Sequence, residues 1–505
     1  MPDIYPTALP APSGPHDLPG TPDPRDPRGL RRDAPLLDAW LTFTAQVQAG
    51  ELLPMGVPGH KQRQDLVGSV VAGDAPFYGG LDTIKHADVL RADGEARAAR
   101  LWGADWCRFS VAGSTHGNQA LALAVGSPGQ EVIITRILHR SLLLGLVLAG
   151  LTPIWVRPEV DRATGLPQGV APATVRRALS ANPGVRAVFV GDPSYVGTVG
   201  DISGLADAAH EHDVPLIVDA AWAAHFGFHP ALPRHPLQLG ADVMVTSAHK
   251  TLPAWSQAAL VLARTDRVDP ARLNAGVEAT ATTSPAGAIL ASTDAARALL
   301  ERDGHTLLGD AVAATRRARD RLRDIAGLTV LDGPAADPLK LTLVLAGTGA
   351  DGNRVEQDLL AAGLPVESAD RDVLVAVVSL ADTPETLTRL TTVLTDSLRR
   401  HRGAPRPVIG PAAYGVEPVT AMPPRPAFFA ATTTLPIDQA VGRVCAELVA
   451  PYPPGIPVLA PGEQITADAL AALDRARRAG VRIAYAADPS LATLRVIGPP
   501  ELGEP

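Results

Sequence analysis

Lysine is almost absent from this 505-residue chain. Only four of its 45 lysine and arginine residues are lysines, namely Lys61, Lys85, Lys250 and Lys340. Arginine stays protonated and cannot act as an amine nucleophile, whereas a desolvated lysine can lose its proton and form a Schiff base. Scarcity therefore makes each lysine a candidate for chemistry, and its setting must decide among the four.

Cysteines and long apolar runs are scarce too. Cys107 and Cys445 lie far apart and form no CxxC pair, which favours buried thiols in a reducing compartment, and no metal-ligand cluster is visible. The longest apolar stretch, 141–156, is interrupted by Pro153 and is too short to cross a bilayer. A net charge of −8 argues against a nucleic-acid partner. We therefore expect a cytoplasmic protein with neither a membrane nor a nucleic-acid partner.

Strand-like apolar runs alternate with helical stretches over the first half of the chain, which predicts an α/β fold with a large, doubly wound, mostly parallel sheet. The pattern changes near Pro285, where shorter strands follow a long Arg-rich helix. From this we expect five parts: a disordered Pro-rich tail (1–34), a large domain with an amino-terminal arm (35–290), a small α+β domain (291–401), a linker (402–426) and a carboxy-terminal α+β domain (427–505).

Polar chemistry follows two apolar runs of the predicted sheet. Asp219 ends the run 214–219, and Lys250 comes just after the run 241–247. Ligands of parallel sheets bind beyond the carboxyl ends of the strands, where both side chains are expected. A lysine that carries an aldehyde as an imine, with a carboxylate that keeps a ring nitrogen protonated, suits pyridoxal phosphate. The alternative for Asp219 is a helix N-cap.

The segment Gly113-Ser114-Thr115 follows a strand and opens a helix, so its backbone N–H groups and hydroxyls suit a phosphate. A small-residue turn of this kind also arises from packing alone. His139 follows another strand and is placed to stack on a cofactor ring; an ordinary polar turn residue is the alternative. His249, next to Lys250, is a candidate phosphate ligand or proton donor, or else a structural histidine.

Together these segments resemble the Orn/Lys/Arg decarboxylase family. The similarity runs from about residue 36 onward. It rests on Pro58-Gly-His-Lys61, Gly113-Ser-Thr-His-Gly-Asn118, His139-Arg-Ser141, Asp219-Ala-Ala-Trp222, Ser247-Ala-His-Lys-Thr251, Thr282-Thr-Ser-Pro285, Pro451-Tyr-Pro-Pro-Gly-Ile-Pro457 and Pro461-Gly-Glu463. The chain departs from the family at His116, where many relatives carry a small residue, and at Ala220, where many carry Glu. Only a tail precedes the fold, which resembles the short form without an amino-terminal wing domain.

The resemblance implies an enzyme of the aspartate-aminotransferase fold type (fold type I) that uses pyridoxal 5′-phosphate to decarboxylate arginine, lysine or ornithine. It implies catalytic roles for Lys250, His249, His139 and Asp219. The cofactor would also contact Gly113, Ser114, Thr115, Ala221, Ser247 and, from a neighbouring subunit of a homodimer or larger homo-oligomer, Ser284. Asp82, Asp88 and Glu463 are candidate partners for the distal cation of the substrate. The alternatives are another reaction of this fold type, such as an aminotransferase or lyase reaction, and a catalytically silent homologue.

Overall fold

The computed structural model describes residues 24–54, 56–75, 89–408, 410, 415–452 and 455–498. Asp82 and Asp88, two of the candidate substrate residues, lie outside these ranges. Residues 24–34 belong to the expected tail, yet they form a turn and a short 3-10 helix, η1 (Leu30–Arg32). Arg28 pairs with Asp303 at 3.1 Å, so this part of the tail contacts the body of the protein.

A seven-stranded sheet forms the centre of the molecule, in the order β1-β9-β8-β7-β6-β2-β3. Its strands are β1 (Trp106–Ser110), β2 (Glu131–Thr135), β3 (Thr152–Val156), β6 (Val188–Gly191), β7 (Leu216–Asp219), β8 (Val243–Thr246) and β9 (Ala259–Ala263). Every neighbouring pair from β8 to β3 is parallel, whereas β9 runs antiparallel to both β8 and β1. The predicted doubly wound, mostly parallel sheet is confirmed.

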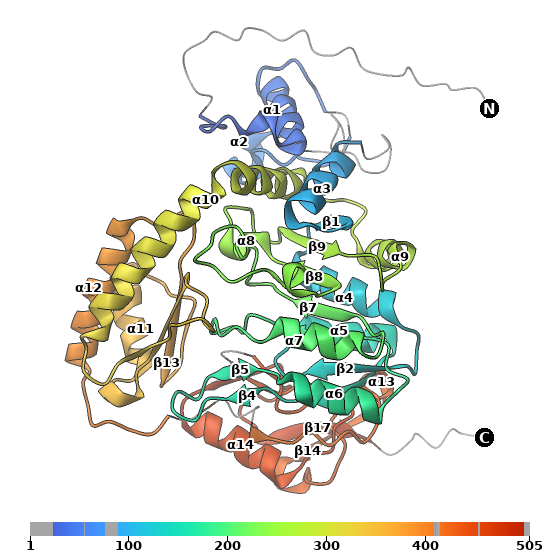
Figure 1. The fold of residues 1–505 in the computed structure, drawn as a ribbon, viewed down its shortest axis with the longest axis vertical. Coiled ribbons are helices and arrows are strands. Elements are labelled where there is room, and N and C mark those ends of the chain that lie inside the picture. Colours follow the sequence, from blue (N-terminus) through green and yellow to red (C-terminus); the bar gives the residue numbers. More distant parts are fainter. Residues whose placement is uncertain are drawn as a thin grey trace.

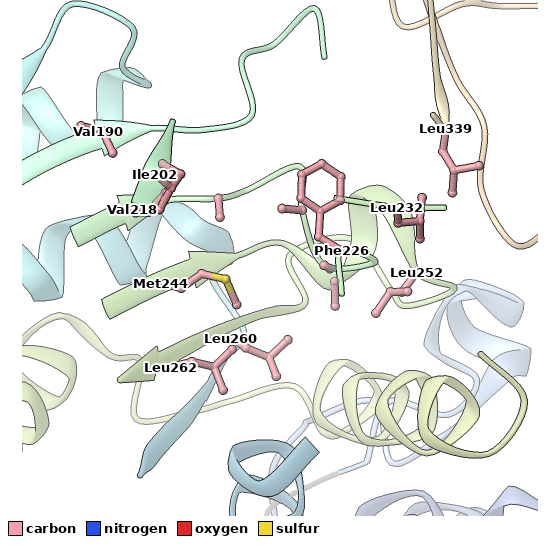
Figure 2. Close-up of a cluster of buried hydrophobic side chains, with 14 of the residues drawn as sticks. Val190, Ile202, Val218, Phe226, Leu232, Met244, Leu252, Leu260, Leu262 and Leu339 are labelled. Atoms are coloured by element: carbon pink, nitrogen blue, oxygen red, sulfur yellow. The ribbon is translucent and has the colours of Figure 1, made fainter. Parts of the chain in front are cut away.

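Both faces of the sheet are buried, which explains why its strands are continuously apolar. One face packs against α4 (Gly113–Val125), α5 (Arg140–Ala149) and α9 (Pro270–Thr280). The other packs against α3 (Val89–Trp102), α6 (Pro172–Ala181) and α7 (Ile202–His210). Figure 2 shows Val218, Met244 and Leu262 on this second face, with Leu339 of the small domain beside the same cluster.

The helix α10 (Gly287–Arg323) connects the large domain to the small one. Its first turns pack against α1 (Pro35–Gln48) and its last turns against α12 (Pro384–Arg400). In Figure 1 it runs diagonally from the top of the molecule to the orange small domain. The boundary expected near residue 290 falls inside this helix. The small domain has a sheet of order β10-β11-β13-β12: β10 (Thr329–Val330), β11 (Lys340–Val344), β12 (Ser368–Ala369) and β13 (Val373–Val377). Helix α11 (Gly352–Ala361) also belongs to it.

The carboxy-terminal part packs below the sheet in Figure 1, near α6 and the short hairpin of β4 (Glu159–Val160) and β5 (Pro167–Gly169). Its elements are α13 (Pro424–Phe429), β14 (Thr432–Pro436), β15 (Ala450–Tyr452), α14 (Ala467–Arg478), β16 (Arg482–Ala484) and β17 (Thr493–Ile497). Its apolar core includes Ile137 of the large domain. Within the described ranges, no helix is long and apolar enough to cross a membrane.

Candidate active site

A cavity of about 500 Å³ lies at the carboxyl ends of the parallel strands, where the three folded parts of the chain meet. The large domain contributes most of its wall. The small domain adds Glu367 and Val377, and the carboxy-terminal part adds Tyr452, Gly455, Ile456 and Tyr485. Five of the predicted site residues line it: His139, Asp219, Ala221, His249 and Lys250. The cavity therefore brings together the residues that the sequence places at or after the carboxyl ends of strands.

Asp219 is the last residue of β7, and its carboxylate is held in place by two donors. The Asn118 side-chain amide donates to its Oδ2 at 2.8 Å, and the Ala221 N–H donates to its Oδ1 at 3.3 Å. Asn118 also donates to the Ser141 hydroxyl at 3.0 Å, which links α4 and α5 to the carboxylate. Asp219 is not an N-cap; it is a buried acceptor at the cavity wall.

Lys250 lies on the short helix α8 (Ala248–Thr251), just beyond β8. Its Nζ is 4.2 Å from the centroid of the Trp222 ring. Burial lowers the pKa of this amine, although the carboxylates of Asp219 and Glu367 oppose the shift. A lysine with a lowered pKa is more often unprotonated, as an amine nucleophile must be.

His139 caps the amino terminus of α5. Its Nδ1 accepts the Ser141 N–H at 3.3 Å, so the ring proton belongs on Nε2. His249 donates from Nδ1 to the Ala258 carbonyl at 2.8 Å, so the lone pair of its neutral ring is on Nε2. Burial lowers the pKa of both imidazoles, so both are neutral near pH 7. A neutral ring suits stacking on an aromatic cofactor and the transfer of a proton.

The predicted phosphate segment lies next to the Lys250 segment, although it does not line the cavity. Ser114 and Ser247 share a hydrogen bond of 2.7 Å between their hydroxyls. Gly113 has a φ of +71°, and Thr115 is exposed in the first turn of α4. No side chain caps α4. The Gly113 N–H donates to the Gln257 carbonyl at 2.8 Å, so an anion would be bound by the N–H groups that follow it in the first turn. A buried carboxylate, a desolvated lysine and an uncapped helix start thus fit pyridoxal phosphate.

Sequence reasoning missed Glu367, which the small domain contributes to the cavity. Glu367 precedes β12, and the Tyr195 hydroxyl donates to its Oε1 at 3.2 Å. Among the described residues that line the cavity, Glu367 and Asp219 are the only carboxylates, and Tyr195, Tyr452 and Tyr485 lie around the same cavity. A glutamate before a short strand has no distinguishing pattern in the sequence. Only the docking of the small domain brings Glu367 to this position.

The comparisons with known proteins agree with this geometry. The model of the Orn/Lys/Arg decarboxylase major domain matches residues 77–333, and that of the C-terminal domain of the same family matches residues 411–478. An arginine decarboxylase of Halalkalibacterium halodurans is 32% identical, over 87% of this chain and 94% of its own length. The chain belongs to this family. A Bacillus subtilis arginine decarboxylase is 31% identical, with the same coverage of both chains.

Solved structures of the family share the fold. Lysine decarboxylase A from Pseudomonas aeruginosa superimposes with a TM-score of 0.75 over 93% of this chain and 81% of its own, at 22% identity. Membership of the Orn/Lys/Arg decarboxylases makes this chain a pyridoxal-phosphate-dependent amino-acid decarboxylase with an α/β fold.

The expectation that Glu463 faces the substrate is wrong. Glu463 is buried and forms a two-pronged ion pair with Arg136, at 2.6 and 3.0 Å. The same guanidinium donates to the carbonyls of Pro457 and Val458, both at 3.1 Å, and lies 4.5 Å from the Trp155 ring centroid. In this decarboxylase Glu463 therefore joins the carboxy-terminal part to the end of β2.

Glu463→Gln should destabilise the protein without changing substrate affinity. Removal of one partner leaves a buried, uncompensated guanidinium, which costs about 3–5 kcal/mol. Glu417→Gln is the matched control, because Glu417 forms an exposed 2.7 Å pair with Arg157 at the end of β3 and should change stability by less than about 1 kcal/mol. Denaturant unfolding and KM measured below the transition test both. A raised KM with unchanged stability would show that Glu463 contacts the substrate after all.

Asp219→Asn should preserve the fold and lower turnover by orders of magnitude. The asparagine is isosteric, yet it cannot hold a proton on a pyridine nitrogen by charge. Turnover of the loaded enzyme, with circular dichroism as the folding control, measures this. Turnover within about threefold of the wild type would mean that Asp219 only supports the local structure.

Proposed function

We propose that this protein decarboxylates arginine to the corresponding amine and CO2. The observation that carries the proposal is the pair Glu367 and Lys250 on one cavity, because the cavity then offers an acid for a distal cation and an amine for the reacting end. The two relatives described above are called arginine decarboxylases, which supports arginine over lysine or ornithine.

The outer cavity suits a guanidinium in particular. Glu367 is exposed, and its Oε1 accepts one hydrogen bond, from the Tyr195 hydroxyl. Because each carboxylate oxygen can accept more than one hydrogen bond, the group could still bind both prongs of a guanidinium, and tyrosine rings lie beside it. Planar guanidinium groups stack on aromatic faces more readily than ammonium groups do. Arg140 already lies 4.6 Å from the Tyr485 ring centroid, which is the same kind of contact made by the protein itself.

Each of the predicted site residues would have a separate role in the reaction. Pyridoxal phosphate, when bound, supplies an aldehyde for Lys250 and a ring that accepts the electrons left when CO2 departs. Asp219 would hold the proton on the ring nitrogen, and His139 would stack on the ring. Ser114, Ser247 and the start of α4 would bind the phosphate. Lys250 Nζ, or His249 once its Nε2 has taken up a proton from solvent, would deliver a proton to the α-carbon.

The assay that tests this function incubates the loaded enzyme with arginine, lysine and ornithine separately. Arginine should give its amine and CO2 with the largest kcat/KM. Release of an α-keto acid instead would support the aminotransferase alternative. Activity with lysine or ornithine above that with arginine would refute the proposed substrate while leaving the decarboxylase intact.

Glu367→Gln should raise KM for arginine by about tenfold and leave kcat nearly unchanged. The loss of one charge-assisted hydrogen bond to the distal group weakens substrate binding without touching the reacting carbon. The cofactor absorbance should not change. An unchanged KM, together with normal KM in the remote control Glu417→Gln, would show that the distal cation binds elsewhere.

We also propose a homodimer, which two exposed features support. Leu53 is 78% and Val70 81% exposed in the arm, and Val57, Leu66 and Val67 are exposed in the same segment. A row of exposed apolar side chains favours burial against another surface. Ser284 is exposed in the loop between α9 and α10, as a residue that reaches a neighbouring subunit must be.

Mixing two inactive variants tests the shared site. Lys250→Ala and a bulky change, Ser284→Arg, should each abolish activity, and a reassembled mixture should recover up to about a quarter of it, because hybrid dimers contain one intact site. Sedimentation should give a dimer. Full activity of a sedimenting monomer would refute the shared site.

A cytoplasmic location completes the proposal. Cys107 and Cys445 are free and buried. Burial raises the pKa of both thiols, that of Cys445 to about 12, so neither is a reactive thiolate. Unpaired, inert cysteines are typical of proteins of a reducing compartment.

A further inference from the structure

Lys340 is a buried amine for which the chemistry described above has no use. It is the first residue of β11 in the small domain, and its side chain is only 1% exposed. Within the described ranges its Nζ has no hydrogen-bond partner. A buried ammonium without an acceptor is costly. In a chain with four lysines, an amine at this position therefore calls for a physical reason.

The neighbouring chain is shaped to admit this side chain. Gly197 has a φ of +85°, and a Cβ built on it would lie 2.9 Å from both Cβ and Cδ of Lys340. Glycine thus leaves room for the lysine stem, which reaches out of the small domain toward the large one. At its end, Nζ is 3.3 Å from the centroid of the Trp222 ring and 5.5 Å from that of Tyr195.

Trp222 is shared by two lysines. Lys250 Nζ is 4.2 Å from the ring centroid that Lys340 Nζ contacts. Trp222 and Lys250 line the cavity, whereas Lys340 is not among the lining residues and lies behind this wall. Two amines on one ring repel each other when both are charged, while the ring stabilises a single cation.

The charged groups around Lys340 leave it balanced between its two forms. Burial is the largest influence and, with repulsion from Lys250, lowers its pKa to about 7, against the attraction of Asp337 and Glu367. The Asp337 carboxylate already binds His225 at 3.0 Å and the Leu339 N–H at 2.9 Å, so it is no direct partner. The Arg319 guanidinium donates to the Lys340 carbonyl at 2.9 Å, so it contacts the backbone of this residue.

We propose that Lys340 is a positioning residue whose charge is coupled to that of Lys250. Lys340 is neutral while Lys250 is an ammonium. When Lys250 is held as an imine, Lys340 takes up a proton, and the Trp222 ring stabilises the resulting cation. Lys250 must lose one proton to the cavity water before it can attack an aldehyde, and Lys340 gains one from the same water. Where the imine is unprotonated, one cation therefore remains on Trp222. When the substrate displaces Lys250, the charge on Lys340 favours a neutral, nucleophilic Lys250.

The decisive measurement follows the lysines of the cofactor-free protein by NMR, with ¹³C at the ε-carbon. Four lysines give four signals, which single substitutions assign. The Lys340 signal should titrate near pH 7 in the wild type and about one unit or more higher in Lys250→Met, where the repelling charge is gone. The Lys61 signal should not move, and Lys61→Met, the control variant, should leave the Lys340 midpoint unchanged. Equal Lys340 midpoints in the wild type and Lys250→Met would overturn the proposal.

A second variant tests the coupling from the other side. In the loaded protein, Lys340→Met should shift the pH midpoint of the visible imine absorbance upward by about one unit, because a nearby cation disfavours a protonated imine. A midpoint equal to that of the wild type would refute the coupling. The proposal rests on the proposed function only for the imine role of Lys250. The NMR comparison needs neither cofactor nor substrate, so its failure is distinct from a failure to decarboxylate arginine.

Discussion

The active-site cavity depends on a buried ion pair 327 residues apart in sequence, between Arg136 and Glu463. Arg136 follows β2 directly, and three residues later the same segment presents His139 to the cavity. On the other side, the backbone that the guanidinium binds, at Pro457 and Val458, continues the turn whose Gly455 and Ile456 line the cavity. A buried charge pair is costly to separate, so the contact holds the two walls together.

Burial also sets the chemistry of the cavity. It lowers the pKa of Lys250, of His139 and of Lys340, which shifts both amines and the imidazole toward their neutral forms. Asp219 is kept in the same enclosed place by hydrogen bonds from Asn118 and Ala221. An enclosed cavity that combines a fixed carboxylate with basic groups of lowered pKa suits chemistry in which protons are given and taken.

The small domain contributes functional side chains as well as part of the cavity wall. Glu367 and Lys340 both come from its sheet region, and they meet the large domain around Tyr195 and Trp222. The negative group faces the cavity and the amine lies behind its wall. Glu367, on the cavity side of Tyr195 and Trp222, would favour a cationic substrate. Lys340, on the other side of these rings, would balance the charge of Lys250.

The sequence by itself determined the parallel sheet and the position of the reacting groups. Continuous apolar runs predict buried parallel strands. The carboxyl ends of such strands meet at one edge of the sheet, which places Asp219 and Lys250 close together. Lys340 stood out only by its scarcity. The positions and partners of Glu463 and Glu367 were decided by the tertiary structure. Each depends on contacts between segments more than 150 residues apart, which no local pattern encodes, because burial and pairing exist only once separate domains have docked.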